Sequence, residues 1–468
     1  MMGSAKPRGI AVVDVGATNS KVALFDTAMT VVAERKAASV HRPGPPYASI
    51  DPAPLAAFLA ETLPALDRLL PLDTIVPAAH GAALALIAED GGLAMPVMDY
   101  MAVPPDDVIA EYRKIEPPFS ETFGPLLPMA LTHGLQLYWQ ETRFPEEFAR
   151  VATVMPWIQY VSYLLSGVTA VEISSISCQS QLVDVKARTY SSLAHSRGWD
   201  RFFPPMAMAW DVLGPLKPEY RGADFRGRGA VLAGVHDSSA NYLRYLAAGQ
   251  GSFTLLSTGT WIIGFDTDAD LDRLDRNRDT VSNTDVLGRV VASCRFFGGK
   301  EFEIIAAGAP AEAARLDSVR RLMARGTMPL ASFTDSGGPM PGTGGKGRII
   351  GPAVENAEAR SSIAALYCAL MCDQSLDAIG SKARIIIDGP FAENPVFLSI
   401  LAALRPSQQV LASDLRDGTT AGAAMLALME GNGRLPQIAL TLRPVAPARL
   451  EGLEQYRQDW LGRSLAQT

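Results

Sequence analysis

The sequence predicts an α/β fold that is built as two domains. Apolar segments with the two-residue period of strands alternate along the chain with segments of helical period, which is typical of α/β layers. A strand, a small polar turn and a second strand occur at 10–27 and again at 251–268, and both copies carry Phe-Asp-Thr. The chain has 468 residues, more than one hydrophobic core usually supports. These observations predict a structural repeat, with a domain boundary within 247–251.

In the first half of the chain, strands are predicted at 10–16 and 21–26, joined as a hairpin. Residues 52–70 have a helical period, although Pro64 interrupts it. A strand then leads into a turn at His80 and Gly81. The segment 146–167 is predicted to form two helical pieces that meet near Pro156 and end at Gly167.

In the second half, 228–251 reads as strand, turn and helix, and the turn contains His236, Asp237 and Ser238. The repeated strand, Ser/Thr/Gly turn and strand follow at 251–268. Residues 383–404 then predict a strand, a glycine turn and a helix, and 413–431 predicts a helix of small residues behind a polar cap.

The composition narrows the class of protein. The chain is 48% hydrophobic and 19% charged, with a formal net charge of −7, which disfavours nucleic acid or an anionic membrane as partner. It has no charge-free apolar run of membrane-spanning length, and its first nine residues lack a signal-peptide apolar region, so we expect a cytoplasmic protein. Cys178, Cys294, Cys368 and Cys372 form no Cys-x-x-Cys pattern. Cys368 and Cys372 share one helix face, and we interpret them as small buried residues in a reducing compartment.

The first hairpin carries groups suited to phosphate binding. Asp14 ends the first strand, and Gly16, Thr18, Asn19 and Lys21 follow it. Glycine turns after strands bind phosphates through backbone N–H groups, and a carboxylate can hold Mg²⁺ directly or through water. The P-loop pattern fits neither Gly345-Lys346 nor Gly299-Lys300, and the Rossmann fingerprint is absent after the first strand. The remaining route is a pair of phosphate-binding hairpins, one per domain, although Asp14 as a turn residue and Lys21 as a solvated charge are alternatives.

The ordered set of motifs resembles the FGGY carbohydrate kinases, within the superfamily of sugar kinases, actin and heat-shock ATPases. The resemblance spans nearly the whole chain and rests on Asp14-x-Gly16-x-Thr18-Asn19-x-Lys21, "LYWQ" at 137–140, "GVHDSSA" at 234–240, Thr258-Gly259-Thr260 and "IIIDGPFAEN" at 385–394. It implies two actin-like (ribonuclease H-like) domains with a nucleotide cleft between them. Residues 1–247 would bind the sugar and carry the first phosphate hairpin, and residues 248–468 would bind the nucleotide. Domain closure would then exclude water, so that ATP meets sugar and is not hydrolysed.

The same resemblance implies the site residues. Asp237 would be the general base, because phosphoryl transfer to an alcohol needs a carboxylate to accept the hydroxyl proton, and it would join Asp14 as a metal ligand. His236, His80 and Trp139 would bind the sugar, although each also has a structural interpretation. The expected nucleotide-binding residues are Gly16, Thr18, Asn19, Lys21, Thr258, Gly259, Thr260, Gly389 and Asn394. The expected cofactors are ATP and Mg²⁺. Pro390 departs from the family, which usually has a second glycine there.

The residues around Asp237 and the "STGTW" turn look most like kinases of 6-deoxy-ketoses such as L-rhamnulose and L-fuculose. A kinase for another sugar or polyol (xylulose, ribulose, glycerol or erythritol) is the first alternative. The second is an actin-like nucleotide-binding regulator without sugar chemistry, which would not need Asp237 in its turn. The expected partner is a small-molecule sugar, with neither nucleic acid nor membrane, and a homodimer is left open.

Overall fold

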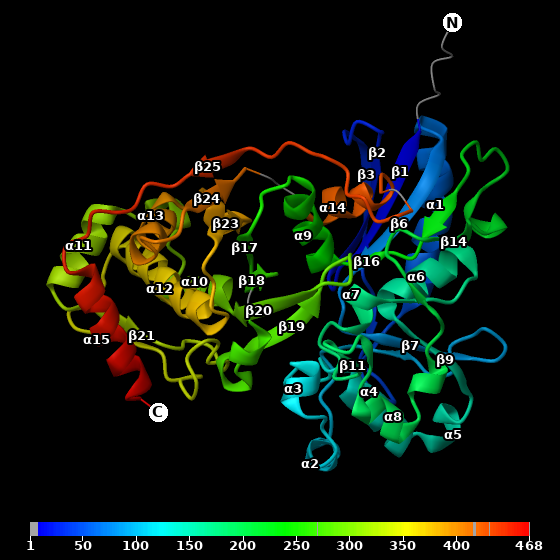
Figure 1. Cartoon of the computed structure of the whole chain (residues 1–468), viewed down its shortest axis with the longest axis horizontal. Coiled ribbons are helices and arrows are strands. Elements are labelled where there is room, and N and C mark those ends of the chain that lie inside the picture. Colours follow the sequence, from blue (N-terminus) through cyan, green and yellow to red (C-terminus); the bar gives the residue numbers. More distant parts are fainter. Residues whose placement is uncertain (1–7, 269, 415–417, 430, 468) are drawn as a thin grey trace, which may run out of the picture. The chain divides into compact units, whose positions relative to one another are not determined.

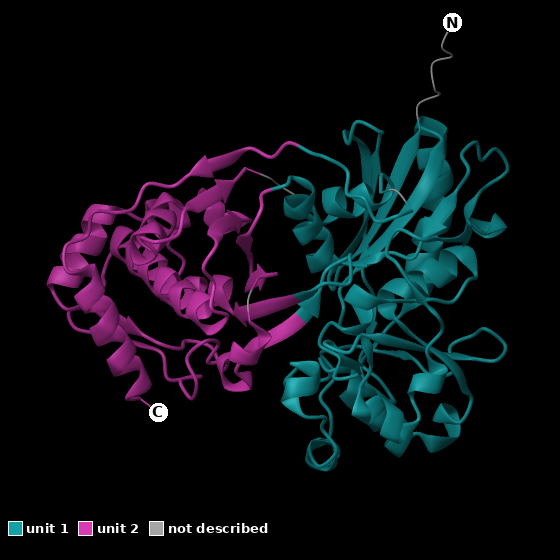
Figure 2. Ribbon diagram, viewed as in Figure 1, with its two compact units in different colours: residues 1–249, 283–290, 417–438 teal, residues 250–282, 291–416, 439–468 magenta. Residues whose placement is uncertain are grey.

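The computed structural model describes residues 8–268, 270–414, 418–429 and 431–467. The chain forms two compact units, shown in Figure 2: unit 1 (residues 1–249, 283–290 and 417–438) and unit 2 (250–282, 291–416 and 439–468). The first segment of unit 1 ends at residue 249, which lies within the predicted boundary region 247–251. Two later segments return to unit 1, which a single boundary does not describe. Residues 1–7 and part of the expected polar cap, residues 415–417, lie outside the described residues.

Unit 1 is built on a sheet that combines an antiparallel hairpin with parallel strands (Figure 1). Strand β1 pairs antiparallel with β2 and parallel with β6. Both β15 and β16 pair parallel with β6. Across the sheet the strands are β3 (Val31–Ala38), β2 (Asn19–Phe25), β1 (Gly9–Val15), β6 (Leu72–Ala79), β15 (Ala230–Leu232) and β14 (Val212–Pro215), with β16 (Val235–His236) also on β6.

Helices cover both faces of this sheet. Successive side chains of β1 point to opposite faces, so Val13 and Val15 enter one core while Ile10 and Val12 enter the other. The first core is covered by α1 (Pro52–Leu69), which continues through Pro64, and by α6 (Trp157–Ser166). The second is covered by α9 (Asp237–Ala247) and α14 (Gly418–Leu426).

Helices α9 and α14 pack closely because α14 carries glycine at the contact. A Cβ atom on Gly422 would lie 1.8 Å from the Ala240 carbonyl oxygen, and one on Gly418 would lie 1.9 Å from Asn241 Oδ1. A side chain at Gly422 would meet backbone and force the helices apart, whereas one at Gly418 would require the Asn241 side chain to move. The small residues near the end of the chain are therefore what lets α14 cover the helix that begins at Asp237.

Unit 2 repeats the central strand order of unit 1. Strand β17 pairs antiparallel with β18 and parallel with β23, as β1 does with β2 and β6. Strand β18 pairs antiparallel with β20, and β23 pairs parallel with β24. The predicted structural repeat is thus confirmed. The strands in order are β19 (Thr280–Thr284), β20 (Val290–Phe296), β18 (Ile262–Asp266), β17 (Phe253–Thr258), β23 (Arg384–Asp388), β24 (Val410–Ser413) and β25 (Leu442–Pro444).

The core of unit 2 surrounds a long buried helix, α12 (Ala357–Ala378). Cys368 and Cys372 lie on this helix as free, fully buried thiols, as predicted. The other helices of the unit are α10 (Gly298–Ala306), α11 (Leu316–Ala324), α13 (Pro395–Leu404) and α15 (Leu453–Leu465).

The prediction of two helical pieces in 146–167 is wrong for the first piece. A short helix, α5 (Pro145–Phe148), is followed by a strand, β9 (Val151–Pro156), and only the second piece is helical, as α6. Strand β9 pairs antiparallel with β7 (Leu84–Ala88), and its β-branched residues fit that pairing better than a helix. Gly167, at a φ of 78°, ends α6 as predicted.

Short elements complete the chain. The remaining strands are β4 (His41–Arg42), β5 (Ser49–Ile50), β8 (Val97–Met98), β10 (Val171–Glu172), β11 (Val183–Asp184), β12 (Thr189–Tyr190), β13 (Met206–Ala207), β21 (Met328–Leu330) and β22 (Arg348–Ile350). The remaining helices are α2 (Asp106–Arg113), α3 (Phe119–Thr122), α4 (His133–Arg143), α7 (Ile173–Ile176) and α8 (Ser192–Arg197), with short 3-10 turns between them. Within the described ranges, no helix combines the length and apolarity that a membrane span requires.

Candidate functional site

The carboxyl ends of three parallel strands meet at one edge of the unit 1 sheet. Asp14 of β1 and His236 of β16 are paired with neighbouring residues of β6. His80 directly follows β6, and Asp237 directly follows β16 as the first residue of α9. Four of the predicted site residues, far apart in sequence, therefore come together at this edge.

Asp14 and Asp237 belong to the same side of the sheet. Because Ile10 and Val12 enter the core beneath α9, the strand period puts Asp14 on that face as well. Adjacent strands are about 4.8 Å apart, so the two aspartates are separated by about 10 Å of backbone across β6. Among the described residues, no group of three or more His, Cys, Asp or Glu side chains could hold a metal ion. Mg²⁺ in proteins is usually bound by one or two carboxylates together with phosphate and water oxygens, and the pair Asp14 and Asp237 could supply those carboxylates.

Asp237 is held through one of its two carboxylate oxygens. Its Oδ1 accepts hydrogen bonds from the Ser238 backbone N–H (2.6 Å) and hydroxyl (3.1 Å), and lies 3.1 Å from His236 Nε2. Its position at the start of α9 also favours a negative charge. These contacts fix the carboxylate and leave Oδ2 as the oxygen that can accept a proton from a bound hydroxyl group.

His236 is a buried cation beside this carboxylate. Burial alone would lower its pKa, but the neighbouring Cys178 and Asp237 outweigh burial and raise the pKa to about 9. The Cys178 thiol lies 3.5 Å from Nε2. At neutral pH the imidazolium therefore helps to hold Asp237 in place. Cys178 carried no sequence signal beyond its small size, so sequence reasoning did not connect it with this site.

Two further histidines in unit 1 are neutral: His133 is fully buried, and His80 is partly buried with its Nδ1 out of contact with solvent. Burial lowers the pKa of His80 to about 4 against the opposing charges of Asp237 and Asp99, and it lowers the pKa of His133 to about 4. No described group meets His80 Nδ1 with hydrogen-bond geometry, and the His133 ring has only the Gly81 backbone as a polar neighbour that raises its pKa by hydrogen bonding. A buried polar atom left in this state costs about 1–3 kcal/mol, which a hydroxylated ligand would offset.

Helix α4 contributes polar side chains that sequence reasoning missed. His133 and Gln136 are three residues apart on this helix and are both buried. Gln136 Nε2 donates to the Ala82 and Ala130 carbonyls, and no described donor meets its Oε1. The signal available in the sequence was their helical spacing from Trp139. Trp139 itself is 6% exposed and packs against Tyr47, with ring centroids 5.6 Å apart, so its role in sugar binding stays a prediction.

The turn between β1 and β2 is tightly supported. The Gly16 N–H donates to the Asn19 carbonyl (3.0 Å). Ser39 supports the same turn twice, through its hydroxyl to the Gly16 carbonyl (2.8 Å) and through its N–H to the Thr18 carbonyl (3.0 Å). Lys21 lies opposite Asp14 in the register of the hairpin. The predicted phosphate-binding residues of this hairpin therefore form one ordered turn.

In unit 2, the two predicted nucleotide turns lie at the same sheet edge. The Thr258 hydroxyl donates to the Asp388 carbonyl and accepts from the Phe391 N–H (3.1 Å). The Thr258 side chain therefore connects the turn at 258–260 to the turn at 389–391. Because its hydroxyl is used in this contact, a phosphate at this edge would meet Thr260 and backbone groups. Pro390 begins a 3-10 turn, Pro390–Glu393, where its fixed φ suits the first helical position.

The Asn394 side chain caps a helix. Its Oδ1 accepts from the N–H groups of Val396 and Phe397, both at 3.1 Å, and so caps α13. The cap holds the helix that follows the second glycine turn. A contact between Asn394 and the nucleotide stays a prediction.

The start of α10 is a second feature that sequence reasoning missed. The Gly299 N–H donates to the Thr260 carbonyl (3.1 Å), and a Cβ atom on Gly299 would lie 2.2 Å from the Gly259 carbonyl oxygen. The first turn of α10 therefore rests directly on the 258–260 turn. Phe297 gives this helix no side-chain cap. The adjacent glycines at 298 and 299 were the sequence signal for this close contact.

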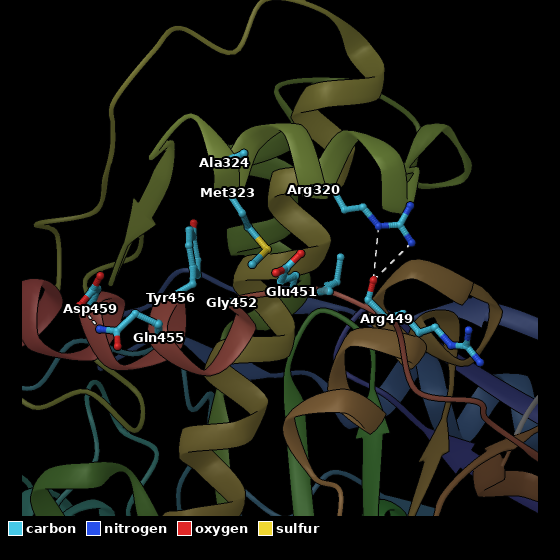
Figure 3. A pocket seen from close by; sticks show the side chains of 10 residues that line it. Arg320, Met323, Ala324, Arg449, Glu451, Gly452, Gln455, Tyr456 and Asp459 are labelled. Carbon is cyan, nitrogen blue, oxygen red and sulfur yellow. Dashed lines mark hydrogen bonds between the residues drawn. The ribbon is translucent and has the colours of Figure 1, made fainter.

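Unit 2 also contains a cavity of about 620 Å³ between α11 and α15 (Figure 3). It shares no residue with the glycine turns. The guanidinium of Arg320 donates to the Arg449 backbone carbonyl through two nitrogens, each at 3.3 Å. The cavity is thus a feature separate from the candidate nucleotide turns.

Gly389 makes the closest backbone approach in these turns, and we expect Gly389→Ala to destabilise the protein by about 2–4 kcal/mol. Its φ of 84° and ψ of −164° suit glycine almost alone, and a Cβ atom would lie 1.9 Å from the Thr258 carbonyl oxygen. Denaturant unfolding measures the loss. Gly259→Ala is the matched control, because a Cβ there meets only the Trp261 carbonyl oxygen, at 3.8 Å. Equal stabilities of the two variants would contradict the expectation.

Comparisons with known proteins agree with this architecture. Residues 250–436 match the family model "Carbohydrate kinase FGGY, C-terminal domain". A carbohydrate kinase from Novosphingobium aromaticivorans is similar to this chain at 32% identity, covering 99% of each chain, with a TM-score of 0.87. A xylulose kinase from Rhodospirillum rubrum is 18% identical, covering 98% of this chain and 99% of that one, with a TM-score of 0.77. Plasmodium falciparum glycerol kinase, solved with ADP, is 12% identical, covering 99% and 98%, with a TM-score of 0.78. No curated protein sequence matches this chain.

The chain belongs to the FGGY family of carbohydrate kinases. The prediction of an α/β fold with two actin-like domains is confirmed, and the chain is an ATP-dependent sugar kinase that acts on a small-molecule sugar. Family membership thereby decides between the kinase and the actin-like regulator that the sequence left open.

Proposed function

We propose that this kinase transfers the γ-phosphoryl group of ATP to a hydroxyl group of a neutral sugar, with Asp237 as the general base. The observation that carries the proposal is the state of the Asp237 carboxylate. Its Oδ1 is held by Ser238 and paired with His236, while Oδ2 remains for a substrate proton. The neutral imidazoles of His80 and His133 lie in the same part of unit 1, and the buried Nδ1 of His80 has unused hydrogen-bonding capacity.

In the proposed reaction, the attacking hydroxyl gives its proton to Asp237 Oδ2 as its oxygen bonds to the γ-phosphorus. The bond between the γ-phosphorus and the bridging oxygen breaks, and ADP leaves. His80, His133 and Gln136 orient the remaining hydroxyls as donors or acceptors. Mg²⁺, held through Asp14 and Asp237, would offset the charge on the phosphates. The free thiols fit a kinase that works in the cytoplasm.

Within the sugars, we propose a 6-deoxy-ketose of the L-rhamnulose or L-fuculose type, with xylulose, ribulose, glycerol and erythritol as alternatives. The charges that act on His80 favour a neutral substrate, because Asp237 and Asp99 are both carboxylates. A sugar acid such as gluconate would place a third negative charge beside them. The preference among neutral sugars rests on the resemblance around Asp237 alone.

A panel of these compounds with ATP and Mg²⁺ in a coupled ADP assay tests the proposal. We expect the 6-deoxy-ketoses to give the highest kcat/KM, and gluconate to give the lowest. A pentulose or polyol as the best substrate would replace the 6-deoxy-ketose and leave the kinase chemistry standing. ADP release that does not depend on any sugar would contradict the proposed reaction.

We expect Gly259→Val to raise the KM for ATP by about tenfold, equivalent to about 1.4 kcal/mol, with little change in the KM for sugar. A Cβ at this position has space, so valine fits the fold but crowds the turn where we propose that the phosphates bind. Steady-state kinetics with each substrate varied in turn separates the two KM values, and Gly259→Ala is the smaller matched change. A larger rise in the KM for sugar than for ATP would remove the 258–260 turn from nucleotide binding.

A further inference from the structure

His41 connects two parts of unit 1 that we assign to different substrates. It lies on β4, and its Nε2 is 2.7 Å from the Ala17 carbonyl oxygen in the turn between β1 and β2. Its Nδ1 is 2.6 Å from Asp99 Oδ2. Both ring nitrogens thus lie within hydrogen-bond distance of an oxygen atom, one on each side of the ring. Asp99 is only 5% exposed. We call this pair of contacts the His41–Asp99 bridge.

At one end, the bridge helps to orient the phosphate turn. Residues 39–41 contact the carbonyl oxygens of three consecutive residues of the turn. Ser39 donates to the Gly16 and Thr18 carbonyls, and His41 lies beside the Ala17 carbonyl. In a planar trans peptide the carbonyl and the following N–H point in opposite directions. Fixing these carbonyls therefore directs the N–H groups of residues 17–19 to the other side of the turn, where an anion can accept them.

At the other end, the bridge shapes the loop that carries Tyr100. Asp99 Oδ1 accepts from the Met101 N–H (2.9 Å), and the Asp99 carbonyl accepts from the Ala102 N–H (2.9 Å). The Tyr100 ring meets His80 edge-on, with ring centroids 5.4 Å apart. Burial, together with the charges of Asp99 and Asp237, raises the pKa of Tyr100. The carboxylate that receives His41 therefore also sets the position of a ring beside the proposed sugar site.

We propose that the His41–Asp99 bridge couples the binding of the nucleotide phosphates to the binding of the sugar. His41 acts as a positioning residue, because it contacts the turn and Asp99 and not the reacting atoms. Asp99 holds His41 against the turn, and Asp99 is fixed by the loop whose Tyr100 packs on His80. Each substrate then favours the arrangement that the other one needs, and the effect is reciprocal. This inference rests on the proposed positions of the two substrates.

Calorimetry tests the coupling. The Kd of a non-hydrolysable ATP analogue with Mg²⁺ is measured with and without the best sugar of the panel, and the ratio of the two values reports the coupling. We expect a ratio of about 5 or more in the unchanged protein. His41→Ala and Asp99→Ala should each bring the ratio close to 1, and the double variant should add nothing further. His41→Ala should also raise the KM for ATP by about tenfold, the scale of one charge-assisted hydrogen bond.

Ser39→Ala is the matched control. It removes a different support of the same turn and has no contact with Asp99, so it should weaken nucleotide binding and keep the ratio. A ratio near 1 in the unchanged protein, or a ratio that survives His41→Ala, would overturn the bridge. If His41→Gln is needed because His41→Ala unfolds, its amide donates from a single nitrogen and so cannot reach the Ala17 carbonyl and Asp99 from two sides as the imidazole does. The ratio should still fall. Asp237→Asn kinetics reports on the proposed base separately, so either idea can fail without the other.

Discussion

We expect Asp237→Asn to lower turnover by about 10²–10⁴-fold, the usual contribution of a general base, and to leave folding and nucleotide binding nearly unchanged. The amide keeps the shape of the side chain, and its oxygen can still accept from Ser238. The loss arises because the amide group, which replaces Oδ2 of the carboxylate, cannot accept the proton of the attacking hydroxyl. It also removes the negative charge that faces His236 at 3.1 Å.

The measurement is sugar-dependent ADP release under saturating substrates, together with thermal unfolding and nucleotide affinity. Asp106→Asn is a suitable control, because Asp106 is an exposed carboxylate in the first turn of α2. Near-normal sugar-dependent ADP release by Asp237→Asn would remove Asp237 as the base. A general loss of stability would instead point to a structural role for its contacts with Ser238.

Asp14→Ala should lower turnover by about 10²–10³-fold, as expected when several kcal/mol of metal-dependent charge stabilisation are lost. The reason is its place at the end of β1, on the face shared with α9, next to the turn that we expect to bind the phosphates. Sugar affinity should change little, because the buried imidazoles at His80 and His133 remain in place.

Titrating activity against Mg²⁺ gives the decisive readout for Asp14. We expect the concentration of Mg²⁺ for half-maximal activity to rise strongly in Asp14→Ala. Glu34→Ala, an exposed charge on the neighbouring strand β3, should leave this value as it is. An unchanged Mg²⁺ dependence in Asp14→Ala would rule out Asp14 as a metal ligand.

The sequence predicted the two hairpins well because their signals are local. An apolar strand that ends in Asp14 and Gly16, and its counterpart that ends in Thr258 and Gly259, each contain the turn that they form. The register of the parallel strands then brought Asp14, His80 and Asp237 to one edge. These residues come together because each stands where a strand ends, and their roles stay predictions.

Other features depended on contacts that no local pattern reports. The segment 151–156 became a strand because β7 pairs with it, although its neighbours suggested a helix. Whether the Thr258 hydroxyl faces a ligand or the Asp388 carbonyl is set by a partner 130 positions later in the chain. The buried state of His133 and the bonds of His41 likewise follow from packing, so neither residue stood out as part of a site.

The position of α14 has a consequence for how the enzyme is made. Gly418 and Gly422 let this helix cover α9, the helix that begins at Asp237, yet they emerge from the ribosome some 180 residues after it. During synthesis the apolar face of α9 stays uncovered until residues 250–416 have been translated and α14 can follow. The helix that carries the proposed base therefore keeps an uncovered apolar face until translation is nearly complete. A chain truncated after residue 249 would keep every catalytic candidate of unit 1, but this apolar face would stay exposed and promote aggregation.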